Sequence, residues 1–324
     1  GKLLPQDIDF PSGDLYLVDT LTGDLEFISV DSFDRQLDGH SYFPDISADG
    51  SVIAFQTYTG YSSPRIFVRD RTSHTTESVC VNSLGIEANA QCDQLALSAD
   101  GRYVAIESLA DNLDLVQPDT NFDNDIFVHD RVTGNTTRVS VDSFGRETNS
   151  CPGCSDGGHN PDISGDGNYV VFDSPSPGFV ANDTNDANDV FLRDREAETT
   201  TRVSVTSAGD EADGHSFDPT ISDDGRYVAF TSTAKNLDLA DVNGETDIYV
   251  HDRETGTTTR VSRPLDPISD EDGYNINSKI SGDGSHIAFL ANGKNLLEND
   301  QNGYALDAFI AENDPDVLRD LPVG

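Results

Sequence analysis

Three loops of the chain carry Asp and Asn at a spacing that suits a divalent cation. Each has an Asp, then an Asn two residues later and a second Asp six residues later, and two of them add a carboxylate in between. Ca²⁺ takes about six to eight oxygen ligands, which a curling loop supplies from alternate side chains. The spacing predicts calcium bound by Asp119, Asn121, Asp123, Asp125, Asp183, Asn185, Asp189, Asp241, Asn243, Glu245 and Asp247.

The same spacing is also typical of Asx turns, in which Asp and Asn side chains accept hydrogen bonds from their own loop's backbone. The match to the helix–loop–helix calcium motif is partial, because the Gly at its sixth position and its terminal Glu are absent. A longer version of the pattern occurs at Asp300, Asn302 and Asp307. Both interpretations stay open on the sequence alone.

Three histidines form a second candidate group. His40 and His215 each follow a Gly and precede a Pro by four residues, and His159 precedes its own Pro by two. Histidines gathered near one axis could bind a transition metal or act as acid and base. The alternative, which we favour, is that a repeated turn places a polar residue at an equivalent position in each repeat.

The four cysteines fall into two local pairs, Cys80 with Cys92 and Cys151 with Cys154. For Cys151-Pro-Gly-Cys154 a small loop disulfide is favoured over half of a zinc site with His159, a redox motif or free thiols, because zinc needs four ligands and no second pair has a matching spacing. Two disulfides indicate an oxidising compartment. We therefore expect a secreted, cell-surface or periplasmic protein.

These residues lie between short strands that recur along the chain. A Ser-x-Asp-Gly corner occurs five times, at intervals of roughly 50 to 65 residues, which is typical of a propeller or solenoid array. Four strands are expected in each of the first four repeats, and strand D is missing from the last. They are A (44–47, 95–98, 161–164, 219–222, 279–281), B (52–55, 103–106, 169–172, 227–230, 287–289), C (66–70, 126–130, 190–194, 248–252, 308–312) and D (76–81, 136–141, 200–205, 258–262).

Residues 14–19 and 25–30 have the pattern of strands C and D with no corner before them. We therefore expect an all-β protein, a β-propeller of four-stranded antiparallel blades that is closed by its two termini. Six blades are predicted, with five as the alternative. The chain is expected to be one domain, 1–324, from a larger or processed protein, with repeats at about 1–43 (partial), 44–93, 94–160, 161–218, 219–276 and 277–324.

Strand direction alternates, so the B–C and D–A connections emerge at one end of each blade and the A–B and C–D turns at the other. The turns repeat almost unchanged, whereas the B–C and D–A connections are long, polar and variable, as recognition loops usually are. The strand D arginines, Arg138, Arg202 and Arg260, recur in every complete later repeat. Because a catalytic residue is normally needed once, we interpret them as structural staples at the tight-turn end.

Charge limits the possible partners. With 59 acidic and 20 basic residues, the formal net charge is −39. Such a surface repels nucleic acid and anionic membranes and suits divalent cations, cationic partners or a saline medium. The apolar runs are too short to span a membrane. We expect no nucleic-acid partner and no membrane insertion; a monomer is favoured.

The repeated Ser-x-Asp-Gly-Arg-Tyr-Val-Ala-Phe, followed by Asp-Ile-Phe-Val-His-Asp-Arg-x-Thr-Gly, resembles the TolB-type, WD-like β-propeller repeat of bacterial secreted and periplasmic proteins over residues 14–313. The resemblance implies the fold. It leaves the function open, because relatives include envelope scaffolds, propeller domains attached to peptidases and polysaccharide lyases.

The favoured function is a binding or scaffold module that recognises a protein or glycan at the long-loop end, with calcium as the candidate ion for ordering its loops. The alternative is a polysaccharide lyase or hydrolase with its site at the mouth of the central channel. The sequence has no His-Glu-x-x-His helix, no phosphate loop and no Trp for stacking on sugars. Binding is therefore favoured over catalysis.

Overall fold

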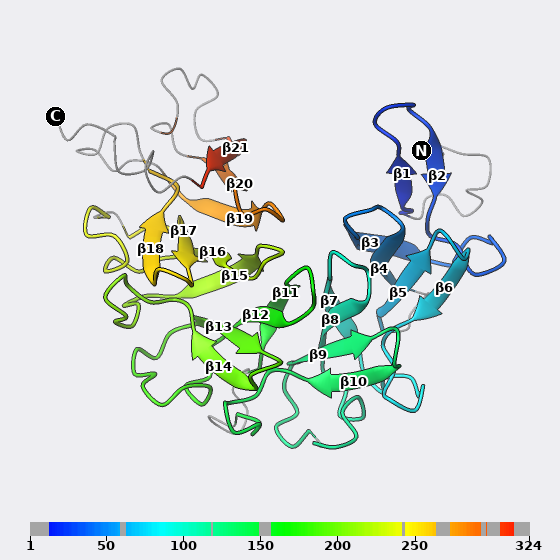
Figure 1. Cartoon of the computed structure of the whole chain (residues 1–324), viewed down its shortest axis with the longest axis horizontal. Coiled ribbons are helices and arrows are strands. Elements are labelled where there is room, and N and C mark those ends of the chain that lie inside the picture. Colours follow the sequence, from blue (N-terminus) through cyan, green and yellow to red (C-terminus); the bar gives the residue numbers. More distant parts are fainter. Residues whose placement is uncertain are drawn as a thin grey trace. The chain divides into compact units, whose positions relative to one another are not determined.

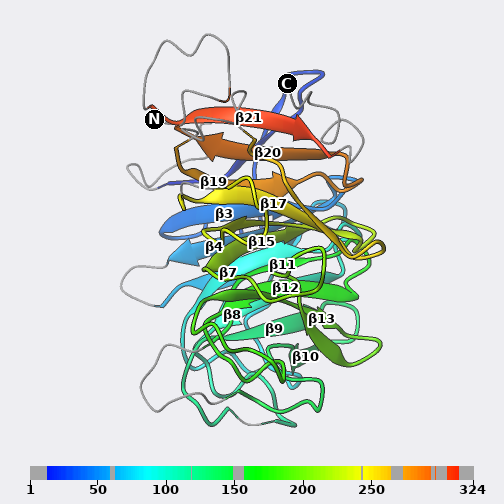
Figure 2. The same cartoon turned by 90° about the vertical axis from the view of Figure 1, so that its left-hand side faces the viewer.

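Short alternating apolar runs fold as antiparallel sheets throughout the described chain, which is an all-β propeller. The structure, a computed structural model, describes residues 13–58, 63–117, 119–148, 157–241, 244–263, 273–292, 296 and 305–313. The chain divides into two compact units, Gly1–Val139 (unit 1) and Ser140–Gly324 (unit 2). Figures 1 and 2 show their strands as small separate sheets.

Unit 1 contains a two-stranded sheet and two complete blades. The two-stranded sheet is β1 (Tyr16–Val18) and β2 (Leu25–Phe27). Blade 1 is β3 (His40–Ile46), β4 (Val52–Tyr58), β5 (Arg65–Asp70) and β6 (Thr75–Ser78). Blade 2 is β7 (Cys92–Leu97), β8 (Tyr103–Ser108), β9 (Asp125–Asp130) and β10 (Asn135–Arg138).

Unit 2 contains two complete blades and one of three strands. Blade 3 is β11 (His159–Ile163), β12 (Tyr169–Ser174), β13 (Asp189–Asp194) and β14 (Thr199–Arg202). Blade 4 is β15 (Ser216–Ile221), β16 (Tyr227–Ser232), β17 (Asp247–Asp252) and β18 (Thr257–Arg260). Blade 5 is β19 (Asn275–Ile280), β20 (His286–Ala291) and β21 (Asp307–Glu312), which lie side by side in Figure 2.

The described residues form five blades, so the prediction of six is wrong and the alternative of five is the count found. The predicted sixth blade needed residues 14–19 and 25–30 as its strands C and D. In the structure β1 and β2 pair only with each other within the described residues. Closure by the termini stays a prediction.

The repeated corner is explained by its side chains. In blade 2 the Ser98 hydroxyl donates to Asp100 Oδ1 and accepts the backbone N–H of Tyr103, while Asp100 Oδ1 also accepts the N–H of Arg102. Gly101 has a φ of 70°, and a Cβ there would lie 2.8 Å from a methyl carbon of Val52. The corner therefore requires Ser, Asp and Gly for its own geometry.

Neighbouring blades within a unit pack face to face. In unit 2, Val190 and Leu192 of blade 3 are buried against Val228 and Phe230 of blade 4. The innermost strands are also joined by hydrogen bonds, such as Ile221 N–H to Asp162 Oδ2 at 2.9 Å. Strand A side chains are thus fixed relative to the next blade of the same unit.

Every strand A also contains a register shift in its pairing with strand B. Beyond this shift, strand A continues past the predicted residues toward the long-loop end. In four blades one residue near this shift has a left-handed backbone: Phe43, Asn160, Asp218 and Asn277. Such bulges turn side chains out of the regular alternation, and they are frequent next to functional sites.

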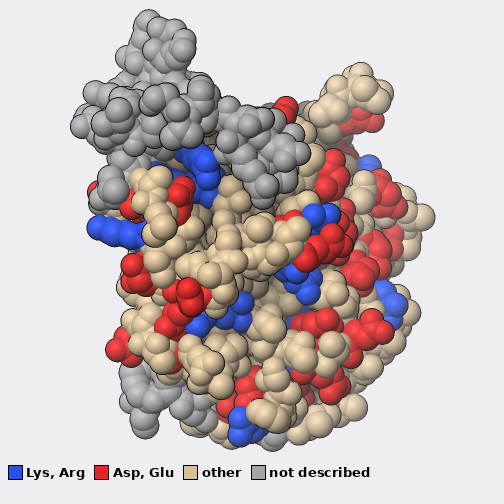
Figure 3. All heavy atoms as spheres, turned by 60° about the vertical axis from the view of Figure 1, so that its left-hand side comes forward, with Lys and Arg blue, Asp and Glu red and all other residues tan. Residues whose placement is uncertain are grey.

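Acidic side chains outnumber basic ones on the face drawn in Figure 3, in keeping with the charge of the sequence. Among the described residues, no helix is long and apolar enough to cross a membrane.

Candidate metal centre at the long-loop end of the blades

The strand D arginines lie at the long-loop end, not at the tight-turn end as predicted. In blade 3, Arg202 ends β14, and its partner Asp189 begins β13 directly after the B–C loop. Antiparallel neighbours run in opposite directions, so the end of one strand meets the start of the other. Strand direction therefore puts Arg202 beside an acidic loop.

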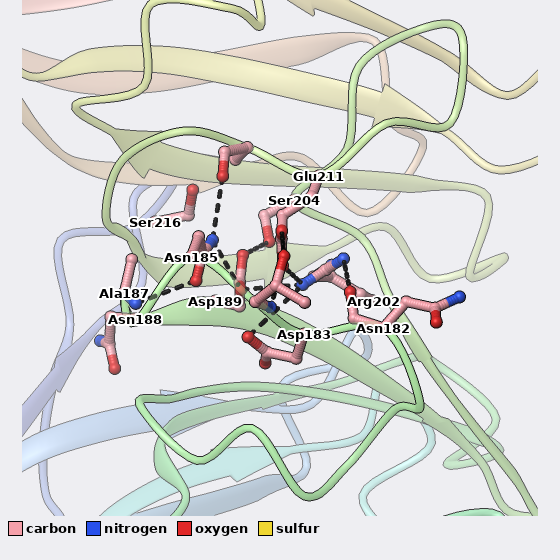
Figure 4. Close-up of polar contacts among 12 residues, drawn as sticks. Asn182, Asp183, Asn185, Ala187, Asn188, Asp189, Arg202, Ser204, Glu211 and Ser216 are labelled. Atoms are coloured by element: carbon pink, nitrogen blue, oxygen red, sulfur yellow. Dashed lines mark hydrogen bonds and ion pairs between the residues drawn. The ribbon is translucent and has the colours of Figure 1, made fainter.

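Three carboxylates surround Arg202 within unit 2 (Figure 4). Its Nη1 contacts Glu211 Oε1 and lies 3.2 Å from Asp189 Oδ2. The same nitrogen lies 3.7 Å from Asp183 Oδ1. The side chains of Arg202 and Asp189 are 9% and 0% exposed. Removing either partner would leave the other as a buried, uncompensated charge.

The cluster fastens two connections that are distant in sequence. Thr184, in the B–C loop, donates its backbone N–H to Glu211 Oε1 at 2.8 Å and its hydroxyl to Oε2 at 2.7 Å. Asn185 Nδ2 donates to the carbonyl of Ala212 at 2.9 Å and to Asp189 Oδ2 at 3.1 Å. Burial alone would raise the pKa of Glu211, but these hydrogen bonds and Arg202 lower it. The B–C loop and the D–A connection of blade 3 thus share one charged centre.

Asp183 is less well satisfied than its neighbours. Its side chain is 3% exposed, and its Oδ2 is buried and accepts no hydrogen bond from the described residues. Burial, then the negative charge of Asp189, raises the pKa of Asp183 to about 6 against the opposing charge of Arg202. Buried polar oxygens nearly always have a partner. Oδ2 of Asp183 lacks one.

The geometry suits a hard divalent cation. Asp183, Asp189 and Glu211 each place a carboxylate oxygen within 4.8 Å of the other two. Calcium–oxygen distances are about 2.3–2.6 Å, so oxygens separated by up to about twice that distance can bind one ion. Three carboxylates and Arg202 together leave two negative charges when all are ionised. A divalent cation would neutralise them.

Blade 2, in unit 1, has an Asx-turn arrangement in the equivalent loop. Asp119 Oδ1 accepts the N–H of Asn121 at 3.0 Å, and Asn121 Oδ1 accepts the N–H of Asp123 at 2.9 Å. Arg138 Nη1 lies 2.7 Å from Asp125 Oδ2 and 4.0 Å from Asp119 Oδ1. These contacts match the alternative interpretation of the spacing, and calcium in this loop stays a prediction.

Blade 4, in unit 2, repeats the basic partner. Arg260 Nη2 lies 2.9 Å from Asp247 Oδ2, and both side chains are almost fully buried. Asp241 is buried too. Of the other ligands predicted there, Glu245 is exposed and Asn243 lies outside the described residues. Asp300 and Asn302 of the fourth loop also lie outside them.

Blade 1 has a glutamate equivalent to Glu211, but its arginine lies on strand C instead of strand D. Ser78 occupies the position of Arg202, and Arg65 occupies the position of Asp189. Arg65 Nε lies 3.7 Å from Glu87 Oε2. Sequence reasoning missed Glu87 and Glu211 as members of these clusters. The available signal was the Val-x-Ser-x-Gly-x-Glu pattern that recurs at 81–87, 141–147 and 205–211.

The histidines have local partners. His40 Nδ1 accepts the N–H of Gly13 at 2.8 Å in unit 1, and His215 Nδ1 accepts the N–H of Asn188 at 3.0 Å in unit 2. His159 begins β11 and lies opposite Asp173 in the sheet. Two of the three therefore hold loop backbone in place, and a catalytic or metal-binding role stays a prediction.

The structure contains the Cys80–Cys92 disulfide, as predicted. It lies in unit 1 and joins the end of blade 1 to the start of blade 2. Cys151 and Cys154 lie outside the described residues.

Several solved propeller structures resemble this chain. TolB from Acinetobacter baumannii has a TM-score of 0.51 at 14% identity, covering 92% of this chain and 59% of TolB. An oligogalacturonate lyase in complex with manganese has a TM-score of 0.53 at 15% identity, covering 91% of this chain and 67% of the lyase.

A prolyl endopeptidase has a TM-score of 0.53 at 13% identity, covering 92% of this chain and 37% of that protein. No protein-family model matches the chain, and no curated protein matches it in sequence. At these identities the likeness shows the fold, a TolB-like β-propeller, which supports many functions.

Proposed function

We propose that this chain is a recognition module whose long-loop end binds a protein or glycan ligand and is ordered by calcium. The observation that carries the proposal is the blade 3 cluster of Asp183, Asp189, Glu211 and Arg202. There a buried oxygen of Asp183 has no hydrogen-bond partner among the described residues, and it lies beside one carboxylate from β13 and one from the D–A connection.

Calcium would act on the loops themselves. An ion held by Asp183 and Asp189 of the B–C side and by Glu211 of the D–A side would restrict both connections at once. Ordering a binding surface in advance lowers the entropy lost when the ligand binds. This gives the cation a role in recognition without any role in chemistry.

The disulfide and the proposed calcium site support a location outside the cytoplasm. The Cys80–Cys92 disulfide supports an oxidising compartment, and millimolar calcium is typical of extracellular modules. We therefore place the protein in the secreted, cell-surface or periplasmic fraction. Binding is preferred to lyase or hydrolase activity because Nδ1 of both His40 and His215 is used by backbone N–H groups.

The test is thermal unfolding of EDTA-treated protein with and without added Ca²⁺, with Mg²⁺ and NaCl as ionic controls. A ligand that binds only the folded state raises the midpoint. The wild type should show a Ca²⁺-specific rise that Asp183→Asn abolishes. Asp186→Asn is the matched control, because Asp186 is exposed in the same loop and has a left-handed φ that Asn also tolerates.

Hydrogen exchange locates the effect. Calcium should slow exchange in residues 182–190 and 206–215 and leave the tight turns unchanged. A rise in midpoint that NaCl reproduces, or one that survives Asp183→Asn, would contradict the calcium-ordered site. Recognition itself is measured by screening glycans and candidate proteins with Ca²⁺ and with EDTA, and binding that is equal in both conditions would separate recognition from the ion.

A further inference from the structure

Blade 1 exposes a cluster of aromatic rings at its long-loop end, made of His40, Tyr42, Phe43 and Tyr58 (the blade 1 aromatic cluster). Tyr42, Phe43 and Tyr58 are 42%, 57% and 37% exposed. The ring of Tyr42 is at the centre, with centroids 5.9 Å from His40, 6.3 Å from Phe43 and 6.0 Å from Tyr58. His40 is fixed by the N–H of Gly13, so it braces the ring of Tyr42.

Phe43 is held in an unfavourable backbone conformation. Its φ is 49°, in the left-handed region, where a bulky residue is an outlier. The equivalent residues of three other blades have φ between 51° and 55°, and they are Asn160, Asp218 and Asn277. Asn and Asp tolerate this region because of their short polar side chains. Phe43 is therefore a poor choice for the fold, and strain of this kind is concentrated at functional sites.

Elsewhere in the described chain, five aromatic rings are covered by arginines. Guanidinium carbons lie 4.1–5.1 Å from ring centroids in five pairs, namely Arg35 with Phe33, Arg102 with Tyr103, Arg146 with Phe144, Arg226 with Tyr227 and Arg253 with Tyr169. No described Arg or Lys covers a ring of the blade 1 aromatic cluster. A cation over an aromatic face is a favourable contact that these rings lack.

We propose that the blade 1 aromatic cluster is the docking site for a cationic segment of a partner protein, which places an Arg or Lys side chain over Tyr42. The net charge of −39 attracts such a segment over a distance and repels acidic ones. The aromatic contact then fixes its position, since a rigid ring binds at low entropic cost. This inference rests on the proposed recognition function and deepens it by naming the partner's chemistry.

The position of the cluster agrees with this role. His40 and Tyr58 pair at the start of β3 and the end of β4, which is the long-loop end of blade 1. Blade 1 is also the blade whose B–C loop lacks the repeated Asp and Asn spacing. Its loop end presents rings where the later blades present acidic loops.

The test uses the whole chain with ¹³C-labelled Tyr and Phe rings and three blocked peptides, Arg-Gly-Arg, Lys-Gly-Lys and Gln-Gly-Gln. The Arg peptide should shift the ring resonances of Tyr42, Phe43 and Tyr58 saturably, the Lys peptide more weakly, and the Gln peptide not at all. Tyr42→Ala should weaken Arg-peptide binding at least tenfold. The matched control is Phe144→Ala, which removes an exposed ring that Arg146 already covers, and it should leave the affinity unchanged.

Phe43→Asn gives an independent readout. It installs the residue type found in blades 3 and 5, so we expect a higher midpoint of thermal unfolding together with weaker peptide binding. A purely structural Phe43 would instead lower the midpoint when replaced, and that result would overturn the inference.

Two further outcomes would also overturn it. Equal affinity in wild type and Tyr42→Ala would mean that the peptide binds the acidic surface in general. Neutral oligosaccharides that shift the same rings when the Arg peptide does not would assign the site to a glycan. The calcium test measures an effect at blade 3, whereas the peptide test measures binding at blade 1. Failure of the cation–ring contact alone therefore does not contradict the proposed recognition function.

Discussion

Replacement of Arg202 by Gln tests the charge balance of the blade 3 cluster most directly. The substitution removes the cation and leaves Asp189, which is fully buried, beside Asp183 and Glu211. Removing one member of a buried ion pair costs about 3–5 kcal/mol. That is a large share of a domain stability of about 5–15 kcal/mol, so the variant should fold but unfold at a much lower denaturant concentration.

The stability lost in Arg202→Gln should depend on pH. Protonation of the remaining carboxyls relieves the repulsion, and one pKa unit corresponds to about 1.4 kcal/mol. The pKa values of Asp183 and Asp189 are already raised in the wild type, and loss of Arg202 raises them further. The destabilisation is therefore expected to be larger at pH 7.5 than at pH 5.

The assay is equilibrium urea unfolding at both pH values in EDTA, repeated with Ca²⁺. Arg35→Gln is the matched control. It breaks an ion pair with Asp31, but the Arg35 side chain is 72% exposed, so the cost should stay below about 1 kcal/mol. Calcium at about 100 times its dissociation constant would raise the free energy of unfolding by about 2.7 kcal/mol.

A loss below about 1 kcal/mol for Arg202→Gln, or one equal at both pH values, would refute the argument that this guanidinium balances buried negative charge. A large loss that calcium does not reduce would keep the charge argument and count against the metal centre.

Three other changes have defined outcomes. Because the pKa of Asp183 is raised to about 6 in the fold, its carboxyl favours folding below its unfolded pKa near 4 and loses that contribution as pH rises through 6. Without calcium, the free energy of unfolding should therefore fall less steeply between pH 4 and 6 in Asp183→Asn than in the wild type. The calcium-induced rise in the unfolding midpoint should be larger at pH 7.5 than at pH 5. Asp162→Ala leaves the N–H of Ile221 without its partner from the neighbouring blade and should cost about 1–3 kcal/mol in urea unfolding. Replacing Cys80 and Cys92 together by Ser should lower stability by about 2–4 kcal/mol, and reductant should then have no further effect on this pair.

The strand pattern and the corners were readable from the sequence because they are local. Asp100, Gly101 and their repeats fold the same few residues into the same turn each time, so spacing alone located them. The Cys80–Cys92 pairing was accessible for the same reason, since the two residues flank one short connection. The blade count was not, because it depends on whether β1 and β2 join another sheet.

Only part of the candidate site could be predicted from the sequence. The acidic loop around Asp183 and Asp189 has a spacing that can be read in one stretch, whereas Glu211 comes from a later connection and Arg202 from the end of the outer strand. Phe43 precedes the predicted strand A at 44–47, and its left-handed backbone angle became known only from the structure.

The sequence by itself determined the repeat, the strand order within a blade and the acidic character of the surface, since these depend on neighbouring residues and on composition. The tertiary structure decided which charges meet. The direction of β14 places Arg202 against the B–C loop, and the fold buries Asp183 so that its second oxygen has no hydrogen-bond partner in the part of the chain that the structure describes. Burial and charge compensation are properties of the assembled blades, because the local dielectric and the distance between side chains exist only after packing.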